Sequence, residues 1–221
     1  FSAPDGRLLV SADYAQIELV ILAHLSRDPN LCAAFTEGKD VHRETASLIF
    51  GVAPDAVSAE QRRTAKTINF GVMYGMSAFR LGNQLGIPRG KAQEFIDSYF
   101  ATYSHIREFI RATIEKAEQT GYVETIMGRK RPIPAINSKN KTEKAGAERI
   151  AVNTPIQGSA ADVVKKAMST RLSKNAFPAQ NFCSKCTTNL SLNVLRTRPS
   201  KRRLSLKKKW KKRYRFPFRC G

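Results

Sequence analysis

The sequence predicts an α+β protein whose first 168 residues are mostly helical and whose remaining residues form a disordered basic tail. Three observations lead to this prediction. Helix-capping signals recur along residues 1–168, two short segments have the residue types of strands, and no steady helix or strand period continues after Met168. A chain of 221 residues is long enough to bury a hydrophobic core. It has no apolar run long enough to predict a membrane span.

The elements follow from local signals along the chain. A buried strand is predicted at residues 7–13, where apolar and β-branched residues follow one another. Asp40 has the position of a helix cap, and Ser58 begins a Ser-x-x-Gln capping box with Gln61. Gly121 ends a long helix, because glycine readily adopts the left-handed conformation found after a helix. Helices are predicted at residues 16–26, 40–50, 58–74, 88–100, 104–120, 141–152 and 159–168, a short strand at 122–127 and a basic turn at 128–134.

The net charge of +20 is distributed unevenly. Residues 1–168 contain 22 Lys and Arg against 18 Asp and Glu, whereas residues 169–221 contain 16 Lys and Arg and no acidic residue. Positive charge favours a polyanionic partner, but here the excess belongs to the tail. Only Cys32 lies in the first part, which favours a cytoplasmic protein. Cys183 and Cys186 have CxxC spacing, but no second pair follows to complete a zinc site.

Residues 61–75, QRRTAKTINFGVMYG, place two cations and two aromatic rings on one face of a helix. They recur every four residues, with the cations first and the rings last. A nucleoside triphosphate has the same polarity, because its phosphates attract cations and its base stacks on aromatic rings. The pattern predicts a triphosphate site, and the alternative is an amphipathic helix with an ordinary solvated face. The residues of this stripe are Arg62, Lys66, Phe70 and Tyr74.

Residues 10–19, VSADYAQIEL, contain a candidate metal ligand. Asp13 stands at the end of the predicted strand, which is a rigid position for a carboxylate that binds a metal ion. Glu18 follows five residues later in the next helix. The alternative is that Asp13 only caps this helix.

Together the two segments resemble the DNA polymerases of family A. DYAQIEL resembles their motif A, and RRTAKTINFGVMYGM closely resembles their motif B, the fingers helix. Asp40-Val41-His42 is similar to the stretch between those motifs, and residues 149–162, RIAVNTPIQGSAAD, resemble the return to the palm. The resemblance extends from about residue 1 to residue 168.

The resemblance implies a mostly helical fingers subdomain inserted in a partial antiparallel palm sheet. Residues 1–29 are then a palm segment with motif A, and residues 30–150 are the fingers with the motif B helix. Residues 151–168 return to the palm, and residues 169–221 are the basic tail.

The resemblance also implies a role for each matching residue. Asp13 and the backbone carbonyl of Tyr14 bind the two catalytic Mg²⁺ ions, and Lys66 donates a proton to the departing pyrophosphate. Glu18 is the steric gate that excludes a 2′-hydroxyl, and Phe70 in place of Tyr implies poor acceptance of dideoxynucleotides. The nucleotide-binding residues are Arg62, Lys66, Phe70, Tyr74, Glu18 and His42, and the DNA-binding residues are Arg149, Asn153 and Gln157.

The acid-free tail lacks the second catalytic carboxylate. Family A enzymes take it from motif C, a His-Asp-Glu triplet, and no such triplet follows Met168. If each tail codon is read one base early, synonymous codons for residues 185–189 permit Val-His-Asp-Glu, and later residues permit further apolar and acidic stretches. We therefore interpret residues 169–221 as a frameshifted segment, with the shift close to Met168.

The predicted function is template-directed DNA synthesis from deoxynucleoside triphosphates, in replication or repair. Its cofactor is Mg²⁺, its partner is template-primer DNA, and the protein is a cytoplasmic monomer with no membrane partner. Because the thumb and motif C are missing, we expect this fragment to be inactive alone. The alternative is a non-catalytic nucleic-acid-binding protein that acts through the cations of its tail. A purely structural helical domain leaves the motif matches unexplained.

Overall fold

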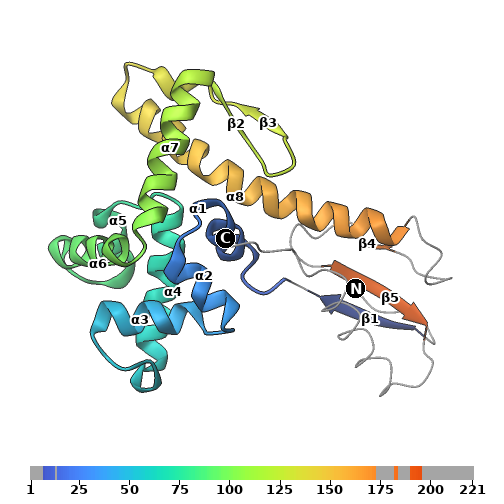
Figure 1. Cartoon of the computed structure of the whole chain (residues 1–221), viewed down its shortest axis with the longest axis horizontal. Helices are drawn as coiled ribbons and strands as arrows, with labels where there is room; N and C mark the ends of the chain where they lie inside the picture. The colour runs from blue at the N-terminus through green and yellow to red at the C-terminus, as the bar shows by residue number, and fades with distance from the viewer. Residues whose placement is uncertain (1–6, 13, 173–181, 184–189, 196–221) are drawn as a thin grey trace. The chain divides into compact units, whose positions relative to one another are not determined.

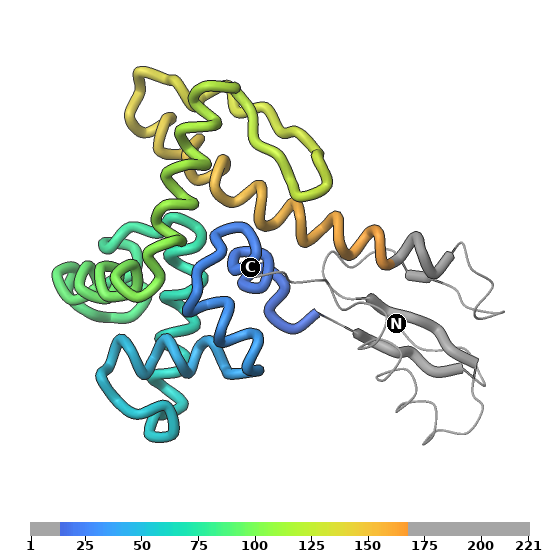
Figure 2. Tube along the Cα trace, viewed as in Figure 1, coloured from blue at the N-terminus to red at the C-terminus, as the bar shows by residue number. Residues whose placement is uncertain are grey.

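The computed structural model describes residues 7–12, 14–172, 182–183 and 190–195, with side chains for residues 14–167. These residues form two compact units, one made of residues 18–159 and the other of the remaining described residues. Figure 1 labels the elements and Figure 2 shows the path of the chain. The prediction of a mostly helical protein with antiparallel strands is confirmed.

The unit of residues 18–159 is built mainly from helices. Within it, α3 packs against α4 and α6, and α5 packs against α6. Its core is formed by aliphatic and aromatic side chains that are almost fully buried, including Leu22, Ile68, Leu81, Tyr99 and Ile106. The helices are α1 Ile17–Ser26, α2 Pro29–Thr36, α3 Val41–Phe50, α4 Ala59–Met73, α5 Ala78–Leu85, α6 Arg89–Thr102, α7 Ser104–Thr120 and α8 Lys141–Leu172, with short 3-10 helices at Pro54–Ala56 and Pro134–Asn137.

The buried carboxylate of Asp28 joins the beginnings of two helices. Its Oδ1 accepts a hydrogen bond from the backbone N–H of Leu31 in α2 (3.0 Å), and its Oδ2 accepts one from the backbone N–H of His105 in α7 (3.3 Å). Helix N-termini carry a partial positive charge and unpaired N–H groups, so one carboxylate satisfies both. This contact fixes α7 next to α2.

The capping box predicted for α4 is confirmed. The Ser58 hydroxyl accepts from the Gln61 backbone N–H (3.1 Å), and the Gln61 side chain accepts from the Ser58 backbone N–H (2.9 Å). Asp40 caps α3 as predicted, and Gly121 ends α7 in the left-handed conformation, with a φ of 74°. The sequence therefore locates the starts of α3 and α4 and the end of α7.

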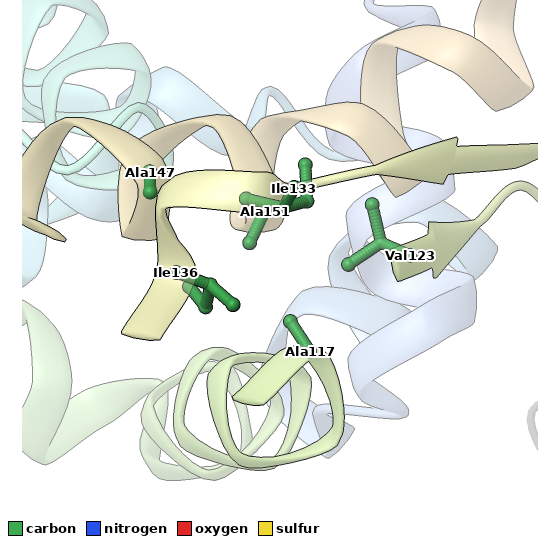
Figure 3. Close-up of a cluster of buried hydrophobic side chains, with 6 residues drawn as sticks. All are labelled: Ala117, Val123, Ile133, Ile136, Ala147 and Ala151. Atoms are coloured by element: carbon green, nitrogen blue, oxygen red, sulfur yellow. The ribbon is translucent and has the colours of Figure 1, made fainter. Parts of the chain in front are cut away.

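A two-stranded hairpin follows α7. Its strands, β2 Tyr122–Glu124 and β3 Lys130–Pro132, pair antiparallel. The prediction of a turn through residues 128–134 is wrong for residues 130–132, because the turn closes earlier, where the Thr125 N–H donates to the Arg129 carbonyl (3.0 Å). Figure 3 shows the buried cluster that α7, the hairpin, the second 3-10 helix and α8 form around Ala117, Val123, Ile133, Ile136, Ala147 and Ala151.

Helix α8 is continuous, and the prediction of two helices at residues 141–152 and 159–168 is wrong. Pro155 lies inside it, where proline lacks the N–H of one helical hydrogen bond and costs about 3 kcal/mol or more. Buried residues continue across this point, since Ala151, Val152 and Ile156 are all at most 5% exposed. Tertiary burial therefore outweighs the local preference of proline.

Two short helices, α2 and α5, have no counterpart among the predicted elements. Each has eight residues, and each begins at a side-chain cap, Asp28 for α2 and Ser77 for α5. The Asp28-Pro29 pair follows the helix predicted at residues 16–26 and marks its end, but aspartate followed by proline also begins a helix.

The other unit contains a three-stranded sheet with the order β1-β5-β4. β1, Arg7–Ala12, pairs antiparallel with β5, Leu190–Leu195, so that Arg7 lies opposite Leu195 and Ala12 opposite Leu190. β5 also pairs antiparallel with β4, Phe182–Cys183. Of residues 169–221, the structure describes the end of α8 and these two strands. The other residues of the predicted disordered tail lie outside the described residues. None of the helices in the described part of the chain is both long and apolar enough to cross a membrane.

The close contact between α8 and the hairpin gives a prediction about stability. A Cβ added at Gly158 lies 2.6 Å from Cγ2 of Thr125. We expect Gly158→Ala to destabilise the protein by about 1–3 kcal/mol, because packed interiors tolerate overpacking poorly. Chemical denaturation followed by circular dichroism measures the change in unfolding free energy.

Gly146→Ala is the matched control. Apart from the backbone of its own helix, the nearest described atom to its Cβ is at the end of the Arg149 side chain, 4.0 Å away. Alanine favours helix over glycine, so this control should gain stability, by up to about 1 kcal/mol. Thr125→Ser removes Cγ2 but keeps the hydroxyl that accepts from the Arg129 N–H (3.2 Å), and it should rescue Gly158→Ala. Equal stability of Gly158→Ala and the parent would show that this contact relaxes at no cost.

Candidate functional site

The predicted stripe lies on α4. Arg62 is half-buried in the first turns, Lys66 is exposed one turn later, and Phe70 and Tyr74 are half-buried at the C-terminal end. The cations and the rings are therefore at opposite ends of one helix face. Tyr74 is the C-cap residue of α4 rather than part of its last turn.

Three rings are arranged in sequence along this face. The Phe70 and Tyr74 rings are stacked, with centroids 6.3 Å apart and an interplanar angle of 20°. The His42 ring, from α3, lies 5.8 Å from Phe70 at an angle of 44°. The predicted residue His42 thus joins the stripe from a neighbouring helix.

Asp40 holds Arg62 in place. Its Oδ2 accepts from Nε of Arg62 at 2.7 Å, while its Oδ1 accepts from the backbone N–H groups of His42 (3.1 Å) and Arg43 (3.3 Å). Burial raises the pKa of Asp40, but the hydrogen bonds and charge of Arg62 and the N–H groups lower it by more, so the pKa lies below its usual range. One carboxylate therefore begins α3 and orients a cation of α4.

His42 is 2% exposed and makes its hydrogen bond inside the protein. Its Nδ1 is 3.0 Å from Nδ2 of Asn69, a buried residue of α4. Burial lowers the pKa of His42; the charge of Asp40 raises it, and the charges of Arg62 and Lys66 lower it further. The net shift is downward, so the imidazole is neutral at neutral pH.

Glu18 and Tyr74 meet at the other end of the stripe. The Tyr74 hydroxyl donates a hydrogen bond to Oε2 of Glu18, which lies in the first turn of α1. Burial, together with this bond, raises the pKa of Tyr74 to about 12, although an interaction with Gln157 lowers it. The phenol therefore keeps its proton and remains a donor.

The three predicted DNA-binding residues share one stretch of α8. Arg149 and Gln157 are exposed, and Asn153 is half-buried. The Asn153 Oδ1 is buried without a hydrogen-bond partner among the described residues, an arrangement that needs an explanation in a folded protein. Gly75, with a φ of 67°, brings the end of α4 close to Arg149, since a Cβ there would lie 3.1 Å from Cγ of Arg149.

Of the two predicted metal ligands, the structure describes only Tyr14. Asp13 lies outside the described residues, and Tyr14 belongs to the other unit. Within the described part of the chain, no group of three or more His, Cys, Asp or Glu side chains is arranged to hold a metal ion. The residues of the stripe, in contrast, all belong to one unit.

The family model described as DNA polymerase family A matches residues 1–188. The chain belongs to this family. Among its curated relatives, the DNA polymerases I of Deinococcus radiodurans and Treponema pallidum are 52% and 54% identical over 168 residues, 76% of this chain. The thermostable DNA polymerase I of Thermus thermophilus is 52% identical over the same length.

A solved structure is also similar to this family A chain. It is the POL domain of Pol1 from M. smegmatis in complex with DNA primer-template and dNTP, which matches with a TM-score of 0.84 and 36% identity. The match covers 92% of this chain and 36% of that chain. The chain spans 17% to 20% of the length of the curated relatives named above.

Sequence reasoning on this family A chain missed the partners of the predicted residues. The sequence indicates Asp40 only as a helix cap and as part of a motif, and it does not predict the ion pair with Arg62. The sequence predicts no role for Asn69 or for its hydrogen-bond partner Thr45. A polar residue flanked by apolar ones in motif B, Ile68-Asn69-Phe70, is the one signal that could have indicated a buried polar contact.

Proposed function

We propose that this chain carries the nucleotide-binding fingers and part of the palm of a template-directed DNA polymerase. The parent reaction is DNA synthesis from deoxynucleoside triphosphates in replication or repair, by phosphoryl transfer with two metal ions. The observation that carries this proposal is the single face on which two cations and two stacked rings of α4 meet His42 of α3. Family membership and the primer-template and dNTP named for the M. smegmatis structure support it.

In this proposal the triphosphate binds at the cation end of α4. Arg62 donates two parallel hydrogen bonds to phosphate oxygens, Lys66 adds a point charge, and His42 donates a further hydrogen bond. The exposed Lys66 then transfers a proton to the departing pyrophosphate. The lowered pKa of His42 fits a neutral donor rather than a third cation.

The base and the sugar bind at the ring end. Phe70 stacks on the incoming nucleotide, with Tyr74 behind it. Glu18 acts as the steric gate against a 2′-hydroxyl, and its hydrogen bond from Tyr74 gives it a fixed position for this role. Phe70 lacks the hydroxyl of a tyrosine, so we propose poor acceptance of dideoxynucleotides.

Template-primer DNA is the proposed partner of α8. Arg149, Asn153 and Gln157 contact its minor groove or primer end. The unpaired Asn153 Oδ1 supports such a role, because a buried acceptor without a donor gains most from a ligand that supplies one. The proposed protein is a monomer located in the cytoplasm, where DNA and deoxynucleotides are available.

Asp13 and the backbone carbonyl of Tyr14 are the proposed Mg²⁺ ligands. Oxygen atoms are the ligands that Mg²⁺ prefers, and both groups supply oxygen. Bound Mg²⁺ activates the primer hydroxyl and neutralises the charge of the leaving group. The fingers segment is assigned to residues 30–150, between palm segments at 1–29 and 151–168.

Nucleotide binding tests the proposed site directly. We expect the double variant Arg62→Ala, Lys66→Ala to bind Mg-dATP at least about tenfold more weakly than the parent, because each hydrogen bond to a charged group contributes about 1.5–3 kcal/mol. Isothermal titration calorimetry measures the two dissociation constants.

The matched control is the double variant Lys91→Ala, Arg111→Ala, which also removes one Lys and one Arg. Both side chains are exposed, on α6 and α7, and neither belongs to the proposed site. The control should bind Mg-dATP like the parent. Equal affinity in the Arg62 and Lys66 variant would refute the site assignment.

The 221-residue chain should not extend a primer. Two metal ions need at least two carboxylates, and no Asp or Glu follows Asp162 in the sequence. We expect no templated product when the chain is incubated with a labelled primer-template, Mg²⁺ and all four deoxynucleotides, with an intact family A polymerase as the positive control. Template-dependent extension that is lost on Lys66→Ala would overturn the expectation.

The frameshift of residues 169–221 can be tested in the coding DNA. We expect that sequencing from codon 160 to beyond codon 221 shows one base missing or added near codon 168, and that the corrected frame contains a His-Asp-Glu triplet. A coding sequence that matches this chain throughout would reject the frameshift and leave an inactive reading frame.

A confirmed tail favours the alternative function, non-catalytic nucleic-acid binding. Its 16 Lys and Arg without any acid are the observation behind it. Such binding weakens steeply with salt, whereas nucleotide binding on α4 depends on Arg62 and Lys66.

A further inference from the structure

A buried chain of hydrogen bonds leads from Tyr103, between α6 and α7, to the candidate site. The Tyr103 hydroxyl is 3.3 Å from Oγ1 of Thr45, Oγ1 of Thr45 is 3.1 Å from Oδ1 of Asn69, and Nδ2 of Asn69 is 3.0 Å from Nδ1 of His42. All four residues are at most 2% exposed. No solvent can replace a lost partner at such depth, so each hydrogen bond constrains the next.

Donation that runs toward His42 fits these distances. Burial raises the pKa of Tyr103, so its hydroxyl keeps its proton and can donate to Thr45. The Thr45 hydroxyl has one proton and two acceptors within reach, Asn69 Oδ1 at 3.1 Å and the Val41 carbonyl at 2.8 Å. In this direction it shares that proton with Asn69 Oδ1. With its oxygen turned to Thr45, the Asn69 amide has its N–H₂ group turned to His42.

This arrangement selects one form of the imidazole. A ring nitrogen that accepts a hydrogen bond carries no proton, and a neutral imidazole has only one proton to place. If Nδ1 of His42 accepts from Asn69, the proton is on Nε2. The Nε2–H form can donate to an anion, whereas the other tautomer presents a lone pair that repels phosphate oxygens.

We propose that Asn69 is a positioning residue that holds His42 as the Nε2–H tautomer, so that His42 donates a hydrogen bond to a phosphate oxygen of the bound nucleotide. This inference rests on the proposed triphosphate site at Arg62 and Lys66. It adds that the donor is prepared before the nucleotide arrives. The cost of orienting the imidazole is therefore met by folding and not by binding.

The tautomer of His42 is measured on the unaltered chain without nucleotide. Two-bond ¹H–¹⁵N correlation of the chain labelled with ¹⁵N-histidine distinguishes a protonated from an unprotonated ring nitrogen. Replacement of His42 by Gln assigns its signals among the three histidines. We expect an unprotonated Nδ1 and a protonated Nε2 at about pH 7.5, above the ordinary imidazole pKa; a protonated Nδ1 would overturn the proposal.

The variant Asn69→Asp tests the link to binding. A carboxylate can only accept, so it should turn Nδ1 of His42 into a donor. At a pH at which the same NMR spectrum shows the imidazole to be neutral, this should weaken Mg-dATP binding by about tenfold or more. Asn83→Asp adds the same charge at an exposed position of α5 and should bind like the parent. Asn69→Asp that binds like the parent, with its helical circular dichroism intact, would also overturn the proposal.

Two further outcomes are distinguishable. If Asn69→Asp does not fold, Thr45→Val removes the hydroxyl that orients the amide, and a mixture of both tautomers is then expected. If the parent has the expected tautomer but does not bind Mg-dATP, the proposed triphosphate site is wrong, and the role assigned to Asn69 is overturned with it.

Discussion

The contact between α3 and α4 is the constraint on which the candidate site depends. Three polar connections cross it among the described residues: the partly exposed ion pair of Asp40 with Arg62, and the buried hydrogen bonds of Asn69 with His42 and with Thr45. The exposed pair contributes little to stability by itself, about 0–1 kcal/mol. The buried bonds of Asn69 are different, because breaking one leaves unpaired polar groups in the core, at a cost of about 1–3 kcal/mol. The buried bonds of Asn69 therefore contribute more to the contact between the two helices than the ion pair of Asp40 does.

The arrangement separates charge from aromatic surface within one unit. At one end of α4, burial and two cations keep His42 neutral; at the other, burial keeps Tyr74 protonated beside Glu18. Both groups are thus hydrogen-bond donors at neutral pH without adding charge. Positive charge at the site comes from Arg62 and Lys66 alone among these residues, which concentrates attraction for an anion at the phosphate end.

The sequence predicts what depends on local pattern. The four-residue spacing from Arg62 to Tyr74, and the capping box at Ser58, are enough to indicate the helix and the face proposed for the nucleotide. They do not predict the partners of Arg62 and His42, because Asp40 is 22 residues from Arg62 and Asn69 is 27 residues from His42, and no local period reports such contacts. The continuity of α8 across Pro155 escapes prediction for the same reason, since burial on both sides of the proline decides it.

Asp40 places a negative charge at a site that is proposed to bind an anion. A single carboxylate in contact with Arg62 competes with the phosphates, but it is weaker than a triphosphate, which has several negative charges and can bind Arg62, Lys66 and His42 at once. If Arg62 turns to a nucleotide as proposed, Asp40 keeps its bonds from the backbone N–H groups of α3, so its carboxylate is not left unpaired. The same residue can therefore orient Arg62 in the free protein and release it without breaking the start of α3.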